Sequence, residues 1–108
     1  MKTLELLTVY ATFENPEQAR AISKTVVGER LAACANIFQP HASIYWWDGE
    51  VQSATECAAL FKTTEKSFEA LKTRIAELHS YECPCIVAWE IEEGHKPYLD
   101  WIAKETVS

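Results

Sequence analysis

Apolar residues recur at steps of three and four positions in two stretches of the chain, which is the spacing of one face of an α-helix. The first stretch follows Asn15-Pro16, a helix-capping residue and a proline at the first helical position, and should run to about Leu31. The second should end near His79 and has the most regular helical period, with apolar positions at Phe68, Leu71, Ile75 and Leu78. A third, shorter helix should begin at Pro97.

Other stretches have the composition of β-strands. Residues 4–12 alternate loosely and are rich in Leu, Thr, Val and Tyr, and residues 34–38 and 85–91 are short runs of apolar and β-branched residues. Pro40 cannot donate a ladder hydrogen bond, so it marks a kink or a bulge after residues 34–38. We expect Trp89 to be buried on a central strand, where removal of its ring would cost about 3–5 kcal/mol.

Asp48-Gly49 is the clearest turn signal in the sequence, because both residues tolerate the positive φ angles of a type I′ hairpin turn. The turn would join strands at residues 43–47 and 50–63, with Trp46 and Val51 on one face and Tyr45, Trp47 and Gln52 on the other. The outgoing strand would be roughly 45 Å long at 3.3 Å per residue. It would therefore project from a compact domain that is about 35 Å across.

A projecting hairpin that carries Tyr45, Trp46 and Trp47 would aggregate unless another subunit covered it. We therefore interpret the hairpin as an assembly device. Trp47→Ala should weaken assembly more than Trp89→Ala, since only the first of these tryptophans lies on the hairpin.

The predicted order is strand, helix, strand, strand, helix, strand and short helix. This is the α+β, ferredoxin-like arrangement, β-α-β-β-α-β plus a short C-terminal helix, in which helices cover one face of an antiparallel sheet. With 48% apolar residues and few Gly or Pro, residues 1–108 should form a single domain.

The net charge of −6 argues against nucleic acid or an anionic membrane surface as the main partner, and a cationic ligand is easier to accommodate. The N-terminal residues resemble neither a signal peptide nor a membrane span, because Glu5 interrupts the apolar run. We therefore expect a cytoplasmic protein. In that compartment Cys34, Cys57, Cys83 and Cys85 should be reduced thiols.

Cys83-Pro84-Cys85 with His79 upstream is the candidate metal site, since two thiolates and an imidazole suit Cu(I) or Zn. In the alternative interpretation, Cys85 begins a buried strand, Cys83 is a loop thiol, and His79 satisfies the last carbonyl groups of the second helix. The sequence leaves both interpretations open.

The chain also contains patterned stretches at residues 29–37, 43–51, 61–63, 79–84 and 98–102. In their order and spacing they resemble the CutA family of divalent-cation tolerance proteins. The resemblance implies a ferredoxin-like subunit in a tight homotrimer built like the PII signalling proteins, with a role in tolerance of copper and other divalent metals. Ala11 stands where some members have a cysteine assigned as a copper ligand, and Ser80 replaces the usual proline.

The resemblance further implies that Arg30, Trp47, Lys62, Tyr81 and Glu82 line a cleft between subunits. Lys62 or Arg30 could hold an anion there, and Glu82 could pair with one of them. The alternative is a structural ion pair that fixes the register of the trimer.

Three classes of function remain. The first is a homotrimer that binds copper or other divalent metal ions, and the second is a PII-like sensor that binds a small anionic molecule between subunits. An enzyme is the least favoured class, because the sequence has no phosphate-binding loop and no nucleophile motif with a paired base. No organic cofactor is expected.

Overall fold

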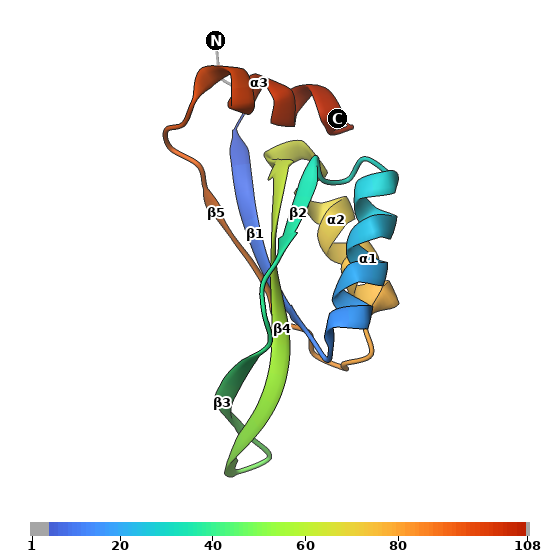
Figure 1. Ribbon diagram of the computed structural model, residues 1–108, viewed down its shortest axis with the longest axis vertical. Coiled ribbons are helices and arrows are strands. Elements are labelled where there is room, and N and C mark those ends of the chain that lie inside the picture. The colour runs from blue at the N-terminus through green and yellow to red at the C-terminus, as the bar shows by residue number, and fades with distance from the viewer. Residues whose placement is uncertain (1–4, 108) are drawn as a thin grey trace.

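The long strand β4 (Glu50–Thr64) organises the computed structural model, which describes residues 5–107 (Figure 1). On one side β4 pairs with β1 (Leu6–Phe13), and β5 (Ile86–Glu90) pairs with the far edge of β1. On its other side β4 pairs first with β3 (His41–Trp47) and then with β2 (Cys34–Ile37). All of these pairings are antiparallel, and the sheet order is β2-β4-β1-β5.

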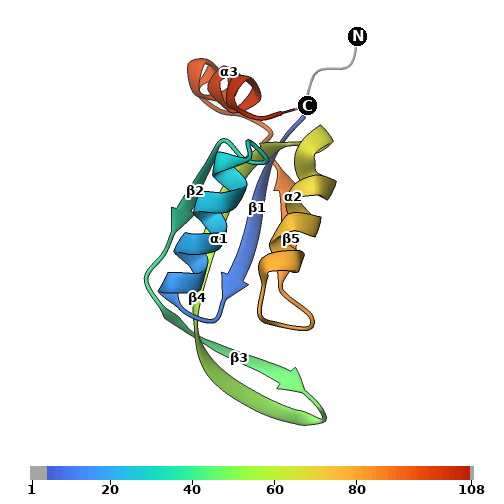
Figure 2. The same ribbon diagram turned by 90° about the vertical axis from the view of Figure 1, so that its right-hand side faces the viewer.

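Two helices, α1 (Pro16–Gly28) and α2 (Glu65–Leu78), lie on the same face of this sheet, and α3 (Lys96–Glu105) lies across one end of it (Figures 1 and 2). The antiparallel sheet and its one-sided cover confirm the ferredoxin-like α+β prediction, but three strands, β2, β3 and β4, lie between the long helices where the predicted order has two. The predicted first residue of the first strand, Leu4, lies outside the described residues. Among residues 5–107, no helix is both long and apolar enough to cross a membrane.

The core lies between the sheet and the two long helices. Alternate residues of β1 face it and meet alternate residues of β4, as in the pair Val9↔Phe61, because successive side chains of a strand point to opposite faces. Leu71 and Ile75, two of the four apolar positions predicted for the second helix, fill the other side, whereas Phe68 is partly buried and Leu78 is exposed. The fully buried members are Val9, Ala11, Phe13, Ala19, Val26, Cys57, Ala59, Phe61, Leu71 and Ile75.

Both long helices begin where sequence signals place a cap. Asn15 Oδ1 accepts a hydrogen bond from Gln18 N at 2.8 Å, and Thr64 Oγ1 accepts one from Ser67 N at 3.2 Å. The second helix ends at Leu78 with His79 as its C-cap, as predicted.

The first helix ends earlier than the predicted Leu31. Arg30 adopts a left-handed φ of 62°, its N–H bonds to Val27 O at 2.9 Å, and Leu31 N bonds to Val26 O at 3.0 Å. This is the Schellman pattern of C-terminal capping. The apolar contact position at Leu31 therefore belongs to the cap and not to the helix.

The expectation that Trp89 is buried on a central strand is wrong. β5 is an edge strand, and Trp89 is 51% exposed on the face of the sheet that α1 and α2 leave uncovered. Its neighbours Ile86 and Ala88 point the other way, toward the core. Because the ring is already half exposed, the subunit does not lose the 3–5 kcal/mol expected for a buried ring when Trp89 is removed.

The hairpin of β3 and β4 projects from the rest of the molecule (Figures 1 and 2). With the hairpin included, the molecule measures 48 × 25 × 23 Å. The register pairs Trp46 with Val51 and Tyr45 with Gln52, as predicted. Asp48 and Gly49 have φ angles of 53° and 80°, which confirms the type I′ turn. Trp46 is 74% exposed, so within one subunit its ring has little cover.

Gly49→Ala should weaken the hairpin, because a Cβ in the left-handed region costs about 1–2 kcal/mol while nothing within 4 Å would clash with it. Hydrogen exchange of the cross-strand amides around Tyr45↔Gln52 should accelerate about 5- to 30-fold. Gly28→Ala is the matched control, since Gly28 also has open space around it but lacks a positive φ. That variant should leave hairpin exchange unchanged, and equal rates in the two variants would contradict the turn assignment.

Candidate functional site

A cavity of about 630 Å³ lies where the base of the hairpin meets the loop between α2 and β5. Its floor is the face of β1 that the helices leave uncovered, because Tyr10 and Thr12 alternate with the buried core residues of that strand. Aromatic and acidic side chains form most of its wall: Tyr10, Tyr45, Trp47, Glu56, Tyr81 and Glu82. A volume in this range is typical of small-molecule sites.

His79 fixes the loop that closes this cavity. Its Nδ1 accepts the backbone N–H of Tyr81 at 3.1 Å, so Nε2 carries the proton and donates to Thr12 O at 2.8 Å. The ring also stacks on Phe13, with centroids 5.2 Å apart, and contacts Tyr81 at 4.7 Å. Both ring nitrogens are therefore engaged, and neither bonds to a carbonyl of α2.

The two residues that follow attach the loop to other elements. Ser80 Oγ donates to Glu14 at 2.9 Å and accepts from Gln18 Nε2 at 2.8 Å, which ties the loop to the start of α1. Tyr81 donates its hydroxyl to Glu56 Oε2 at 2.9 Å, which ties it to β4. Burial, followed by this hydrogen bond, raises the pKa of Tyr81 to about 12.

Cys83 and Cys85 both keep exposed surface and both line the cavity. The alternative in which Cys85 begins a buried strand is therefore wrong, since β5 begins one residue later and Cys85 faces the cavity. Partial burial against the cavity wall still raises the pKa of the Cys85 thiol.

All four cysteines are free thiols, as predicted. Cys57 is fully buried, and burial raises the pKa of its thiol, which contacts Phe38 O at 3.2 Å. Cys34 Sγ lies 3.5 Å from the hydroxyl of Tyr98. Neither of these two cysteines lines the cavity.

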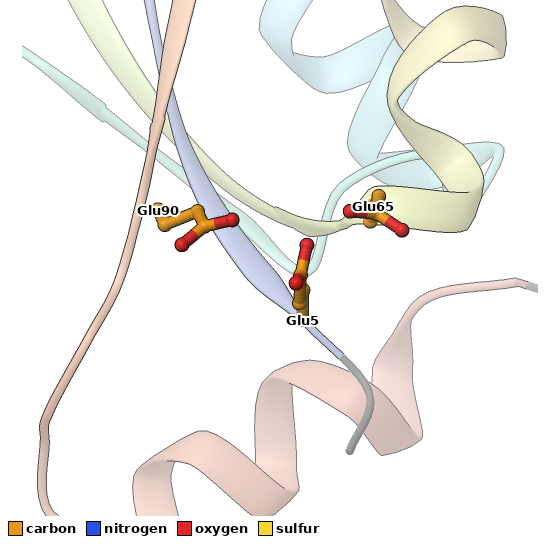
Figure 3. Close-up of side chains that lie close together, drawn as sticks. All are labelled: Glu5, Glu65 and Glu90. Atoms are coloured by element: carbon orange, nitrogen blue, oxygen red, sulfur yellow. The ribbon is translucent and has the colours of Figure 1, made fainter. Parts of the chain in front are cut away.

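His79, Cys83 and Cys85 do not form a preassembled ligand set in this conformation. Across residues 5–107, ligand atoms of three such side chains come within 4.8 Å of one another only in Glu5, Glu65 and Glu90 (Figure 3). The physical reason is that the backbone carbonyl of Thr12 and the N–H of Tyr81 hold the imidazole of His79.

Antiparallel register assembles the three carboxylates at the end of the sheet opposite the cavity. Leu7 pairs with Glu90, and Glu65 N donates to Glu5 O at 3.0 Å. Carboxylate oxygens suit hard divalent cations such as Mg²⁺ or Ca²⁺. No local sequence pattern predicted this group of carboxylates, and the signal that could have revealed it is the pairing of the first strand with both of its neighbours.

The five residues predicted to line one cleft divide into two groups within the subunit. Trp47, Tyr81 and Glu82 share the cavity, whereas Arg30 and Lys62 do not line it. Arg30 forms a salt bridge with Glu105 at 2.8 Å, and Lys62 donates to Asn36 Oδ1 at 3.2 Å. The expected pairing of Glu82 with one of these cations is therefore not made within the subunit.

Comparisons with known proteins are consistent along nearly the whole chain. The family model described as CutA1 divalent ion tolerance protein matches residues 7–105. The divalent-cation tolerance protein CutA of Thermus thermophilus is 48% identical over 98 residues, which are 91% of this chain and 95% of the relative. The protein of the same name from Pyrococcus horikoshii is 41% identical over 101 residues, covering 94% and 98% of the two chains.

Solved structures agree with the sequence comparisons. The divalent cation tolerance protein of Thermus thermophilus superposes with a TM-score of 0.92 at 46% identity and covers 94% of this chain and 99% of that one. CutA1 from Oryza sativa gives a TM-score of 0.94 at 34% identity, with 97% and 96% covered. The chain therefore belongs to the CutA1 divalent ion tolerance family.

Proposed function

We propose that this protein is a cytoplasmic homotrimer that binds copper or other soft or divalent metal ions through Cys83 and Cys85 and so contributes to metal tolerance. The family membership supports a relation to divalent cations. The proposal assigns the protein a binding role and no catalytic step.

The observation that carries the proposal is the position of the two thiols. Cys83 and Cys85 are separated by one residue, both keep exposed surface, and both face the same cavity. Thiolates are the ligands that Cu(I) and Zn prefer, and Pro84 between them restricts the backbone, so less entropy is lost when both sulfurs engage one ion.

Two sulfurs do not complete a zinc site, which normally has four ligands. Glu82 lines the same cavity and offers a carboxylate, and water or a neighbouring subunit would supply the remainder. His79 supports the site through the loop that it holds, because both of its ring nitrogens already have partners.

The PII-like alternative, a small anion held by Lys62 or Arg30, has less support. Each cation already has a partner in the subunit, Asn36 for Lys62 and Glu105 for Arg30. The cavity wall itself carries the carboxylates of Glu56 and Glu82, which would repel an anion.

Replacing both cysteines, Cys83→Ser with Cys85→Ser, should lower the affinity for Cu(I) and for Zn more than tenfold in competition titrations. Cys34→Ser is the matched control, because that thiol lies outside the cavity, and it should bind as the parent does. Affinity should also rise with pH, since the thiols must lose their protons and the raised pKa of Cys85 delays that loss. Parental affinity in the double variant would contradict the thiol site, and Glu90→Gln would then test the carboxylates.

The trimer is supported by apolar surface that a single subunit leaves exposed. Trp46 and Ile44 on the hairpin are each 74% exposed, and Val87 and Trp89 on the uncovered sheet face are each 51% exposed. Exposed apolar area of this kind marks contact surfaces between proteins. The number three follows the family resemblance.

Light scattering coupled to size exclusion should give three times the subunit mass of 12.3 kDa. Trp46→Ala and Trp89→Ala should each shift the assembly toward monomer at low micromolar concentration, because each removes apolar contact area. Since Trp89 is exposed and not buried, we no longer expect its removal to weaken assembly less than Trp47→Ala does. Lys24→Ala, on the exposed side of α1, is the control and should not change the mass. A monomer mass for the parent protein at micromolar concentration would refute the trimer.

A further inference from the structure

The wall of the cavity has a chemical character that metal binding by two thiols does not use. Tyr10, Tyr45, Trp47 and Tyr81 present aromatic rings, and Glu56 and Glu82 present carboxylates. Among the described residues, no Lys, Arg or His lines this cavity. The faces of aromatic rings and the carboxylates both attract positive charge.

The carboxylate of Glu56 is held in place. The Tyr81 hydroxyl donates to its Oε2 at 2.9 Å, and Tyr81 is itself positioned by the contact with His79. This hydrogen bond engages one oxygen of Glu56 with a neutral donor, so the negative charge of the cavity is not cancelled. A fixed charge loses little entropy when it binds a ligand.

The cavity has room for a ligand larger than a metal ion. Within residues 5–107, the acids and thiols of this cavity do not bring three ligand atoms within 4.8 Å of one another. A bare ion with a ligand distance of about 2.0–2.6 Å therefore does not find three of these groups already gathered around one point. A cavity of about 630 Å³ has room for an organic group that spreads its positive charge over several atoms.

We propose that the cavity binds a small organic cation, an alkylammonium compound, with its charged head among Tyr45, Trp47 and Tyr81 and its charge balanced by Glu56 and Glu82. Recognition combines cation–π attraction, which acts within about 6 Å of a ring centroid, with the opposite charge of the acids. The inference does not depend on metal binding, because it uses no sulfur atom.

Choline and 3,3-dimethyl-1-butanol are the decisive probes, because they have nearly the same shape and differ in the positive charge. Isothermal titration at low ionic strength should show choline binding at least tenfold more tightly than the alcohol. Equal binding of the two probes, or no binding of choline up to millimolar concentration, would overturn the proposal.

Variants locate the binding. Glu56→Gln keeps an acceptor for the Tyr81 hydroxyl but removes the charge, and Trp47→Leu removes a ring, so each should weaken choline binding at least fivefold. The matched controls are Glu92→Gln and Trp101→Leu, an acid and a ring outside the cavity, which should bind as the parent does. Loss of choline binding in the controls as strong as in the cavity variants would contradict the site.

The Cys83→Ser, Cys85→Ser variant separates this inference from the metal proposal. It should keep choline binding while losing Cu(I) and Zn. If it keeps the metals and also binds choline, the metal proposal alone fails. Loss of choline binding in that variant, with its fold unchanged by circular dichroism, would overturn the organic-cation site.

Discussion

The continuous pairing of β4 is the constraint on which the rest of the structure depends. Over residues 57–64, β4 is a central strand that pairs with β1 on one side and with β2 on the other. Its inward side chains there are buried. Over residues 50–56 it has only β3 as a partner, and nearly all of its side chains are exposed or half-exposed. One strand therefore joins the core to the hairpin, so the position of the hairpin is fixed by the register in the core.

The helices cover one face of the sheet, so the side chains on the opposite face remain available to form a binding site. Side chains that alternate toward the helices form a dry core, whereas those that alternate away, such as Tyr10, Thr12 and Trp89, are left for a ligand or for another subunit. The cavity lies on this uncovered face at the base of the hairpin. It is bounded by β1, by the hairpin and by the loop before β5, which are far apart in sequence.

Local signals predicted the elements well. Asp48-Gly49 predicted a turn whose two φ angles are positive, and Asn15-Pro16 predicted a helix start that the structure confirms. Features that depend on which strands pair in the sheet could not be predicted from local sequence signals. Trp89 was expected in the core, but β5 is an edge strand. The sequence also did not show that Arg30 occupies a left-handed cap position and pairs with Glu105 within the subunit.

The same distinction applies to the site. The thiols of Cys83 and Cys85 and the imidazole of His79 predicted a site for soft metal ions. In the structure, the backbone of Thr12 and Tyr81 holds that imidazole through hydrogen bonds. Thr12 is far from His79 in sequence, so this contact depends on the tertiary fold. Antiparallel register likewise brought Glu5, Glu65 and Glu90 together from three separate segments (Figure 3).

In the loop between α2 and β5, some residues anchor the loop and others line the cavity, so this short segment holds its cavity side chains in a defined place. His79, Ser80 and Tyr81 anchor it to β1, to the start of α1 and to β4, respectively. Three of the residues that follow, Glu82, Cys83 and Cys85, line the cavity and are not needed to anchor the loop. Ala11, where the family resemblance implies a cysteine in some members, is fully buried among the core residues on the helix-covered face. A thiol at that position would face the core, so the thiols that line the cavity in this chain come from the loop and not from the first strand.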